Sequence, residues 1–356
     1  MPANRIGVGI IGAGNISDTH ARAAAGIPGV FVTAVYGQNA AKAARLAEQH
    51  GATAFTTLDA FLAHRPMDLV AIGSPSSLHA EQGIAAVRRG LHVLVEKPLD
   101  VTTARSDELI DAAARAGVTL GVFFQDRLKP DVVRMKAIVD RGLLGAPVLA
   151  SGRVKWYRPP DYYADSKWRG KRALDGGGAV INQAIHTLDL MLHLFGPIAS
   201  VEAQTATRLH AIEVEDTATA LLRFTSGALG VFEATTSVYP GYPRRLELTG
   251  SRGTLILEHD NLVAIDLVKD AAAALAAEPS LAAGVSAPAA GAQNAASPTV
   301  SDATPHRRIF EDFLAAIQSG ATPACDGREG RRSVEAVEAI YASAREGRPV
   351  TIASGR

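Results

Sequence analysis

A glycine-containing turn between an apolar run and a helical run most limits what this chain can fold into. Residues 6–11 predict a buried strand and residues 15–25 predict a helix. The turn between them reads Gly12-Ala13-Gly14-Asn15-Ile16-Ser17. Gly12 allows a tight turn, Gly14 lets the backbone approach a pyrophosphate, and compact Ser17 takes the third small position. Strand, turn and helix together predict a dinucleotide-binding unit with the pyrophosphate at the helix N-terminus, the alternative being a tight turn that binds nothing.

Repeated strand–helix units follow this turn as far as residue 123. Glycines at positions 51, 90 and 117 mark helix ends. Further strands are predicted at 30–36, 53–55, 68–72, 92–95 and 119–123, and helices at 40–50, 58–63, 78–89 and 102–116. This alternation predicts an α/β fold with a doubly wound parallel sheet.

The pattern changes after about residue 130, and a length of 356 residues fits two domains. A helix is predicted at 132–140. Strands are predicted at 148–157, 201–206, 217–224, 228–236, 244–249 and 253–258, with turns that suit antiparallel connections. We expect an NAD(P)-binding Rossmann domain at 1–125 and a substrate and oligomerisation domain at 126–356. Residues 270–304 are rich in Ala, Pro, Ser and Gly, which predicts a flexible excursion.

Charge and cysteine content narrow the class of protein. Lys and Arg number 36, as do Asp and Glu, so the net charge is +0, which argues against a nucleic-acid or membrane-surface partner. The single cysteine, Cys325, excludes an intramolecular disulfide and a cysteine-based zinc site, and no metal is expected. Without a signal-peptide pattern or a run of about 18 apolar residues, we expect a cytoplasmic protein.

Residues at the ends of the predicted strands are candidates for ligand contact. Gly37 and Gln38 follow the second strand, where a carboxylate normally binds the adenosine ribose, so the choice between NAD and NADP stays open. Ser74 and Pro75 close a later strand and are expected to line the cofactor. His79 starts the next helix, where either a ligand contact or a structural role is open.

Two further strings carry chemistry. In Glu96-Lys97-Pro98, the proline suggests an unusual, possibly cis, backbone, and Lys97 is expected to project toward the nicotinamide. A glycine run at 176–178 opens a helix on which Asn182, His186 and Asp189 are spaced to share one face, which suggests a ligand approaching that helix.

Together these strings resemble the Gfo/Idh/MocA family, whose name comes from glucose–fructose oxidoreductase and inositol dehydrogenase. The resemblance covers nearly the whole chain. Its motifs are the 12–17 turn, Ser74-Pro75 with His79, Glu96-Lys97-Pro98, the 124–130 string, the 176–189 helix, the 248–254 turn and the 326–330 tail.

The resemblance implies a fold, an activity and an assembly. It implies a C-terminal α/β domain with a large open, predominantly antiparallel sheet, used for homo-oligomer contacts as a dimer or tetramer. It implies hydride transfer between NAD or NADP and a secondary hydroxyl or ketone of a sugar, glycoside, nucleotide sugar or cyclitol. The implied cofactor contacts are Gly12, Gly14, Asn15, Ile16, Gly37, Gln38, Ser74, Pro75, His79, Glu96, Lys97 and Gln125.

Catalytic roles also follow from the resemblance. Lys97 is expected to orient the reacting oxygen, and His186 to act as general acid/base. The inositol dehydrogenase branch has an aspartate at the position of Asn182. An amide takes up no proton, so Asn182 is expected to orient a hydroxyl or the imidazole by hydrogen bonding.

Aromatic and cationic residues of the second domain suggest a sugar site. The loop from Arg158 to Arg169 is flanked by both tryptophans and precedes the histidine helix, so it is a candidate substrate wall, the alternative being a structural plug. Expected substrate contacts are Lys97, Trp156, Tyr163, Trp168, Arg169, Asn182, His186 and Tyr242. Arg153, Lys155 and Arg158 add positive charge to that of Lys97 and Arg169. This charge leaves an anionic sugar open as the substrate. His306 either faces the substrate or lies exposed at a helix start.

Three hypotheses about function follow. The leading one is an NAD(P)-dependent dehydrogenase acting on CH–OH groups of a small sugar-like molecule. A second is a redox-neutral enzyme that uses transient oxidation to cleave a glycoside. A third is a non-enzymatic, nucleotide-dependent sugar sensor, against which the presence of Lys97 and His186 argues.

Overall fold

The fold is described here from a computed structural model of the chain. It covers residues 5–164, 166, 168–279, 281, 284–285 and 302–352. The chain divides into two compact units: unit 1 combines Met1–Gln125 with Pro298–Arg331, and unit 2 combines Asp126–Ser297 with Arg332–Arg356. The sequence assigns everything after residue 125 to the second domain, whereas the structure counts residues 298–331 with the first.

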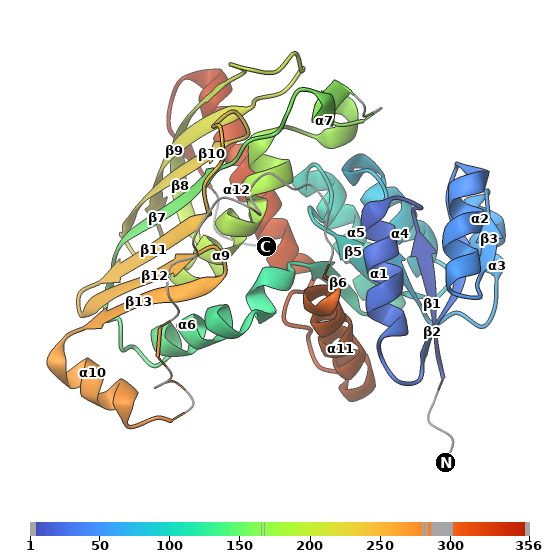
Figure 1. Cartoon of the computed structure of the whole chain (residues 1–356), viewed down its shortest axis with the longest axis horizontal. Coiled ribbons are helices and arrows are strands. Elements are labelled where there is room, and N and C mark those ends of the chain that lie inside the picture. Colours follow the sequence, from blue (N-terminus) through green and yellow to red (C-terminus); the bar gives the residue numbers. More distant parts are fainter. Residues whose placement is uncertain are drawn as a thin grey trace. The chain divides into compact units, whose positions relative to one another are not determined.

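Unit 1 is built on a six-stranded sheet in the order β3-β2-β1-β4-β5-β6 (Figure 1). All of its strand pairs are parallel. The strands are β1 (Ile6–Ile11), β2 (Val30–Tyr36), β3 (Thr53–Phe55), β4 (Leu69–Ile72), β5 (His92–Glu96) and β6 (Leu120–Phe123). Strands β1, β4 and β6 are almost entirely buried, as expected for a sheet covered on both faces. The predicted doubly wound sheet is confirmed.

Helices alternate with these strands, and local signals define their ends. Asn39 caps α2 by accepting a hydrogen bond from the Lys42 N–H at 3.0 Å, and Gly117 ends α5 with a φ of 65°. The helices are α1 (Asn15–Ala25), α2 (Ala40–Gln49), α3 (Leu58–Ala63), α4 (His79–Val87) and α5 (Thr103–Ala116), with short 3₁₀ turns η1 (Ser76–Leu78) and η2 (Gln125–Leu128).

A late segment of the chain completes unit 1. Helix α11 (Thr304–Ser319) packs against α1 and β6, and buries Phe310 and Phe313. Beyond it, the Val122 N–H donates to the Cys325 carbonyl at 2.9 Å. Unit 1 is therefore discontinuous in sequence.

Unit 2 is built on an eight-stranded sheet in the order β13-β12-β11-β7-β10-β9-β8-β14 (Figure 1). Only β7 and β10 pair in parallel; the other pairs are antiparallel. The strands are β7 (Pro147–Lys155), β8 (Ile198–Ala206), β9 (Thr217–Phe224), β10 (Leu229–Thr235), β11 (Arg245–Gly250), β12 (Gly253–Glu258), β13 (Asn261–Leu267) and β14 (Val350–Thr351). The predicted, predominantly antiparallel sheet is confirmed.

One face of this sheet is covered by helices. Helix α9 (Ile185–Phe195) lies against β7 and β11, and a π-helical turn, η3 (Ala179–Ala184), lies against β10. Residues of β9 alternate between buried and accessible, which leaves the opposite face open. The remaining helices are α6 (Pro130–Asp140), α7 (Asp161–Ala164), α8 (Arg172–Asp175), α10 (Lys269–Ala276) and α12 (Gly327–Glu346), whose residues after Arg331 belong to unit 2.

The structure corrects the start of the predicted flexible excursion. Residues 270–276 belong to α10, in which Ala271 and Leu275 are buried one turn apart. Alanine is the best helix former, so an alanine-rich composition is compatible with helix as well as with a linker. The Arg134 guanidinium also donates to the Leu281 carbonyl at 2.8 Å. Within the predicted excursion, residues 280, 282–283 and 286–301 lie outside the described residues, and Thr304 already begins α11.

Within the described ranges, every helix is too short or too polar to span a lipid bilayer.

Candidate functional site

The carboxyl edge of the unit 1 sheet carries the predicted cofactor residues. Because all six strands are parallel, the turns that follow them lie at one edge. Gly12 to Ile16 follow β1, Gly37 and Gln38 follow β2, and Ser74 and Pro75 follow β4. Glu96 and Lys97 lie at the end of β5, and Gln125 follows β6. The structure thus places these residues on five strand ends of the same edge.

Close packing explains two glycines of this edge. Gly12 has a φ of 111°, and a Cβ there would lie 2.5 Å from the Ser17 hydroxyl and 2.7 Å from the Gly73 carbonyl oxygen. A Cβ at Gly37 would lie 2.9 Å from the Ala13 methyl carbon. Ala13 therefore crowds the space that a side chain at position 37 would need.

Two observations fit a dinucleotide at this edge. A Cβ at Gly14 would meet no atom of the described residues within 4 Å, and Gly14, the N-cap residue of α1, has no side chain with which to cap the helix. The N–H groups of that first turn are therefore available to an anionic group such as a pyrophosphate. The Gln125 side-chain oxygen is buried and, among the described residues, has no hydrogen-bond partner. It is available to a ligand at the end of β6.

Lys97 directly follows β5, and the peptide bond from Lys97 to Pro98 is cis. The imidazole beneath this turn belongs to His79, whose ring nitrogens lie 2.8 Å from the Pro98 carbonyl oxygen and 2.9 Å from the Ser74 carbonyl oxygen. His79 is 1% exposed. This geometry supports the structural alternative for His79, because both nitrogens join the turn after β4 to the turn after β5. A contact with the cofactor stays a prediction.

Glu96 points into unit 1 rather than toward a cofactor. Its side chain lies between two buried histidines, His20 and His306. Burial alone would raise the pKa of the Glu96 carboxyl, but these imidazoles and the charge of Lys97 hold that pKa well below its ordinary value. Glu96 is therefore corrected from a cofactor contact to an interior anion, and His306 is buried rather than exposed or facing substrate.

The glycine run before the histidine helix is explained by packing within unit 2. A Cβ at Gly177 would lie 2.1 Å from the Tyr341 hydroxyl, and one at Gly178 would lie 1.8 Å from the Glu215 carbonyl oxygen. The Glu215 carboxylate accepts hydrogen bonds from the Gly178 and Val180 N–H groups at 3.0 and 2.9 Å. These contacts, rather than an approaching ligand, require the small residues.

His186 lies in the first turn of α9, where its Nδ1 is 3.6 Å from a carboxylate oxygen of Asp126. Asp126 also pairs with Arg244 and with Lys129, the latter at 2.7 Å, and both cations reach Asp260. His186 thus stands beside an anion whose charge two fixed cations share. A carboxylate at this distance stabilises an imidazolium, so His186 can hold a proton that is taken from a hydroxyl.

The π-helical turn alters the predicted shared face of Asn182, His186 and Asp189. Asn182 lies within η3, and its amide donates to the Asp175 carboxylate. Asp189 is fully buried and accepts two hydrogen bonds from the Arg127 guanidinium, at 2.8 and 2.7 Å. The three side chains therefore serve different partners. The prediction of one ligand-facing stripe is wrong for Asp189, because this side chain is buried against Arg127.

Aromatic and guanidinium groups gather in the loop before this helix. The Arg158 guanidinium lies 5.1 Å from the ring centre of Trp156 and donates to the Gln183 side chain at 2.9 Å. The Arg169 guanidinium lies 4.4 Å from the ring centre of Tyr162 and 5.1 Å from that of Trp168. Of the ion pairs found among the described residues, none involves Arg169.

Other predicted contacts occupy different places. The Tyr163 ring is buried against Tyr162 and His210, its hydroxyl is 3.0 Å from Thr236, and burial raises its pKa to about 12. These contacts fit the alternative of a structural plug, and a substrate contact by Tyr163 stays a prediction. Tyr242 is 54% exposed.

The candidate cations of β7 need a further correction. Gly152 of this strand faces α9, where a Cβ would meet Met191, so its neighbour Arg153 points to the opposite face of the sheet. Lys155 lies on that same outer face and pairs with Glu233 at 2.7 Å. Of the cations suggested for the second domain, only Arg158 and Arg169 belong to the aromatic cluster.

Asp126 is the site residue that sequence reasoning missed. It lies in the Gln125-Asp126-Arg127 string directly after β6, at the end of a strand where ligand-binding residues are common. That position was the available signal. Its partner Arg244 gives no such signal in the sequence, because it is far away along the chain and only the folded sheet brings it to Asp126.

Acid should destabilise this network. Burial raises the pKa of the Asp126 carboxyl, but Arg244, Lys129 and His186 hold it well below its ordinary value. A depressed folded-state pKa contributes stability that is fully present above the unfolded-state value of about 4 and is lost as pH falls through the folded value. Urea melts between about pH 2 and 6 should show this loss. Asp126→Asn should flatten the dependence, and an unchanged slope would contradict the assignment.

Comparison with known proteins covers both units. Residues 6–124 match the model described as the oxidoreductase family, NAD-binding Rossmann fold. Residues 132–256 match the GFO/IDH/MocA C-terminal domain. D-apiose dehydrogenase of Paraburkholderia graminis is 28% identical over 352 residues, which cover 97% of this chain and 89% of that protein. Inositol 2-dehydrogenase of Rhizobium meliloti is 26% identical and covers 97% of this chain and 98% of its own length.

Solved structures show the same fold. The WlbA dehydrogenase from Bordetella pertussis, in complex with NADH and UDP-GlcNAcA, aligns with a TM-score of 0.87 at 27% identity and covers 100% of both chains. The WlbA enzyme from Chromobacterium violaceum, with the same ligands, aligns at 0.86 with 29% identity, over 100% of this chain and 98% of that chain.

Proposed function

Because the chain belongs to the Gfo/Idh/MocA family of NAD-binding oxidoreductases, we propose that it interconverts a secondary hydroxyl and a ketone on a sugar-like molecule. The observation that carries this proposal is the His186–Asp126 pair, a proton acceptor beside a buried anion. When bound, the dinucleotide supplies a hydride acceptor or donor. The chain's own groups then bind the dinucleotide and the substrate, orient the substrate oxygen and move one proton.

Each unit contributes part of this chemistry. In unit 1, the first turn of α1 offers N–H groups to the pyrophosphate, and Gln125 offers a buried amide oxygen. Lys97, held by the turn above His79, orients the substrate oxygen through its ammonium group. In unit 2, His186 accepts the hydroxyl proton at an imidazole nitrogen and Asp126 stabilises the resulting charge. Asn182, anchored on Asp175, orients a substrate hydroxyl.

The substrate class proposed here is an anionic sugar, either a nucleotide sugar or a sugar acid. Two features support it: the Arg169 guanidinium is stacked on aromatic rings without an ion pair among the described residues, and Arg158 lies in the same cluster. WlbA structures with UDP-GlcNAcA, at 27% and 29% identity, point to the same class. Aromatic faces of Trp156 and Trp168 suit the C–H surface of a sugar ring.

A substrate panel tests this function. Neutral sugars, cyclitols, glycosides, sugar acids and nucleotide sugars are each incubated with NAD and with NADP, and both reduced cofactor and product mass are followed. We expect reduced cofactor and a product two hydrogens lighter, with the highest kcat/KM for an anionic sugar. Release of an aglycone without net reduced cofactor would show redox-neutral cleavage. Binding of cofactor and sugar without turnover of any substrate would support a sensor.

A homo-oligomer through the outer face of the unit 2 sheet is also proposed. Leu149 and Leu229 are cross-strand neighbours on this face, and Leu221 lies beside them on β9; they are 44%, 52% and 58% exposed. Exposed apolar clusters on a sheet typically mark an interface. The cytoplasmic location stays a prediction.

Adding charge to this face should separate the subunits. Leu221→Asp and Leu229→Asp are expected to convert the assembly into single chains, because each buries a carboxylate in the interface. Light scattering after size exclusion measures the mass, and Val133→Asp, on α6, is the matched control at an exposed apolar position. A wild-type chain that is already monomeric at high concentration would contradict the proposal.

A further inference from the structure

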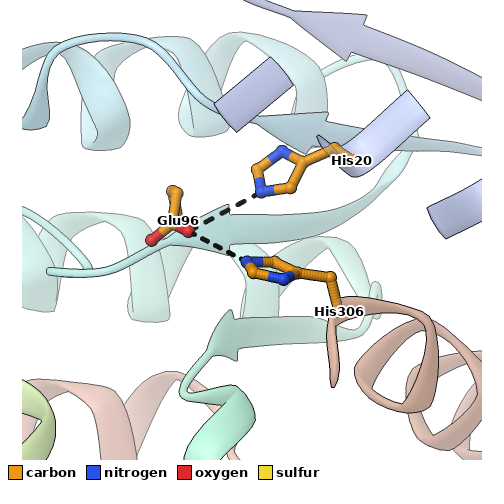
Figure 2. A group of neighbouring side chains, drawn as sticks. All are labelled: His20, Glu96 and His306. Atoms are coloured by element: carbon orange, nitrogen blue, oxygen red, sulfur yellow. Dashed lines mark ion pairs between the residues drawn. The ribbon is translucent and has the colours of Figure 1, made fainter. Parts of the chain in front are cut away.

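Three side chains of metal-ligand type converge in the interior of unit 1. His20 comes from α1, Glu96 from the end of β5 and His306 from the first turn of α11. Figure 2 shows both imidazole rings directed at the carboxylate. One candidate ligand atom from each residue lies within 4.8 Å of the other two. The three residues, here called the His–Glu–His cluster, belong to segments that are far apart in the sequence.

The distances within the His–Glu–His cluster are too long for direct hydrogen bonds. The Nε2 atom of His20 lies 3.7 Å from Oε1 of Glu96, and Nε2 of His306 lies 3.6 Å from the same oxygen. Hydrogen bonds between nitrogen and oxygen are about 2.7–3.2 Å long. Two ligand atoms bound to one tetrahedral zinc ion at about 2.0–2.2 Å lie about 3.3–3.6 Å apart. These two separations between a histidine nitrogen and the Glu96 oxygen are therefore close to those of ligands that share an ion.

The polar atoms of the cluster are buried without other partners. His20 is 0% exposed and His306 is 1% exposed. In the part of the chain that the structure describes, none of their four ring nitrogens has a hydrogen-bond partner. Leaving such groups unsatisfied in an interior is costly, so each unsatisfied group calls for an explanation. A bound ion would satisfy one nitrogen of each ring and one oxygen of Glu96 together.

We propose that His20, Glu96 and His306 bind one divalent transition-metal ion, with zinc as the expected occupant. Two imidazoles and one carboxylate form a common ligand set for zinc, with water at the fourth position. Burial lowers the pKa of His20, which keeps its ring neutral, the form that binds metals. The Glu96 carboxyl is held ionised, the form in which a carboxylate binds a metal.

The ion would connect α1, β5 and the late helix α11 within unit 1. Phe123 stacks on the His20 ring at a centroid distance of 4.1 Å and shields the cluster with an apolar wall. The second Glu96 oxygen accepts a hydrogen bond from the Lys97 N–H, so the ion would also fix the backbone at Lys97. We assign the metal a structural role, and the proposal does not depend on the proposed function.

Metal content provides the direct test. The full-length protein is stripped with a chelator, incubated with ZnCl₂ alone, dialysed and measured by plasma mass spectrometry. We expect about one zinc ion per chain for the wild type, and less than about a tenth of that for His20→Asn and for His306→Asn. The control is His50→Asn, which changes a half-buried histidine of the same unit outside the cluster.

Calorimetry keeps the proposal testable if a variant fails to fold. Zinc should raise the melting temperature of the stripped wild type and of His50→Asn, because a ligand that binds only the folded state stabilises it. No rise is expected for His20→Asn or His306→Asn. Zinc retained equally by the cluster variants would place the metal elsewhere. Absence of zinc and of any melting shift in the wild type would overturn the proposal and leave the cluster as a site for a bridging water.

Discussion

Replacing Lys97 by Met or His186 by Asn is expected to lower turnover by about 10²–10⁴-fold, because each change removes a group that orients the substrate oxygen or moves its proton. The affinity for NADH should stay nearly unchanged, since the pyrophosphate site at the first turn of α1 is intact in both variants. Reduced-cofactor absorbance gives kcat and KM, and quenching of NADH fluorescence gives the dissociation constant.

Matched substitutions separate these roles from general damage. Lys136→Met removes a lysine that pairs with Asp140 on the surface of α6. His50→Asn changes a half-buried histidine at the C-terminal end of α2. Both variants should retain full turnover. In the wild type, kcat should rise with pH as the general base loses its proton. The His186 variant should lose this rise. Wild-type turnover in both the Lys97 and His186 variants, on the true substrate, would contradict the assignment.

The second large effect concerns stability. Arg127→Met is expected to lower the free energy of unfolding of unit 2 by about 3–5 kcal/mol, because it leaves the fully buried Asp189 carboxylate without its bidentate partner. The hydroxyl of Ser333, 2.9 Å from the same carboxylate, replaces only a small part of that pairing. Both tryptophans, Trp156 and Trp168, belong to unit 2, so urea melts followed by tryptophan fluorescence report this unit.

A double variant shows whether the buried charge is the cause. Adding Asp189→Asn to Arg127→Met removes the unpaired anion and keeps the side-chain shape, so part of the lost stability should return. Lys136→Met breaks an exposed ion pair and should cost less than about 1 kcal/mol. If the double variant is less stable than Arg127→Met alone, the buried carboxylate does not explain the loss.

The parallel sheet and its cofactor edge were predictable from the sequence because they depend on local signals. Apolar runs, helix-ending glycines and the Gly12–Ser17 turn are each contained within a few residues. The edge of the sheet then follows from topology, since every parallel strand ends on the same side. Even His79 could be assigned to this edge, although its two contacts with carbonyl oxygens could not.

The chemistry around His186 was only half predictable for a physical reason. Its position on a helix after the glycine run was readable, and Asn182 was expected to orient either a hydroxyl or the imidazole. The structure pairs Asn182 with Asp175 and brings Asp126 to His186 instead. A π turn changes side-chain directions without a clear sequence signal. Contacts such as Asp126–Arg244 join distant segments, which no local pattern encodes.

The late helix α11 has a consequence for the order of events during synthesis. Translation proceeds from the N-terminus, and a domain generally folds as a unit once its chain has emerged. Unit 1 needs α11 to cover β6 and α1, and Cys325 to pair with Val122. A ribosome-bound chain ending at residue 125 therefore exposes Phe123 and its neighbours. The nucleotide-binding half begins the chain but can finish folding only after nearly all of unit 2 has been made.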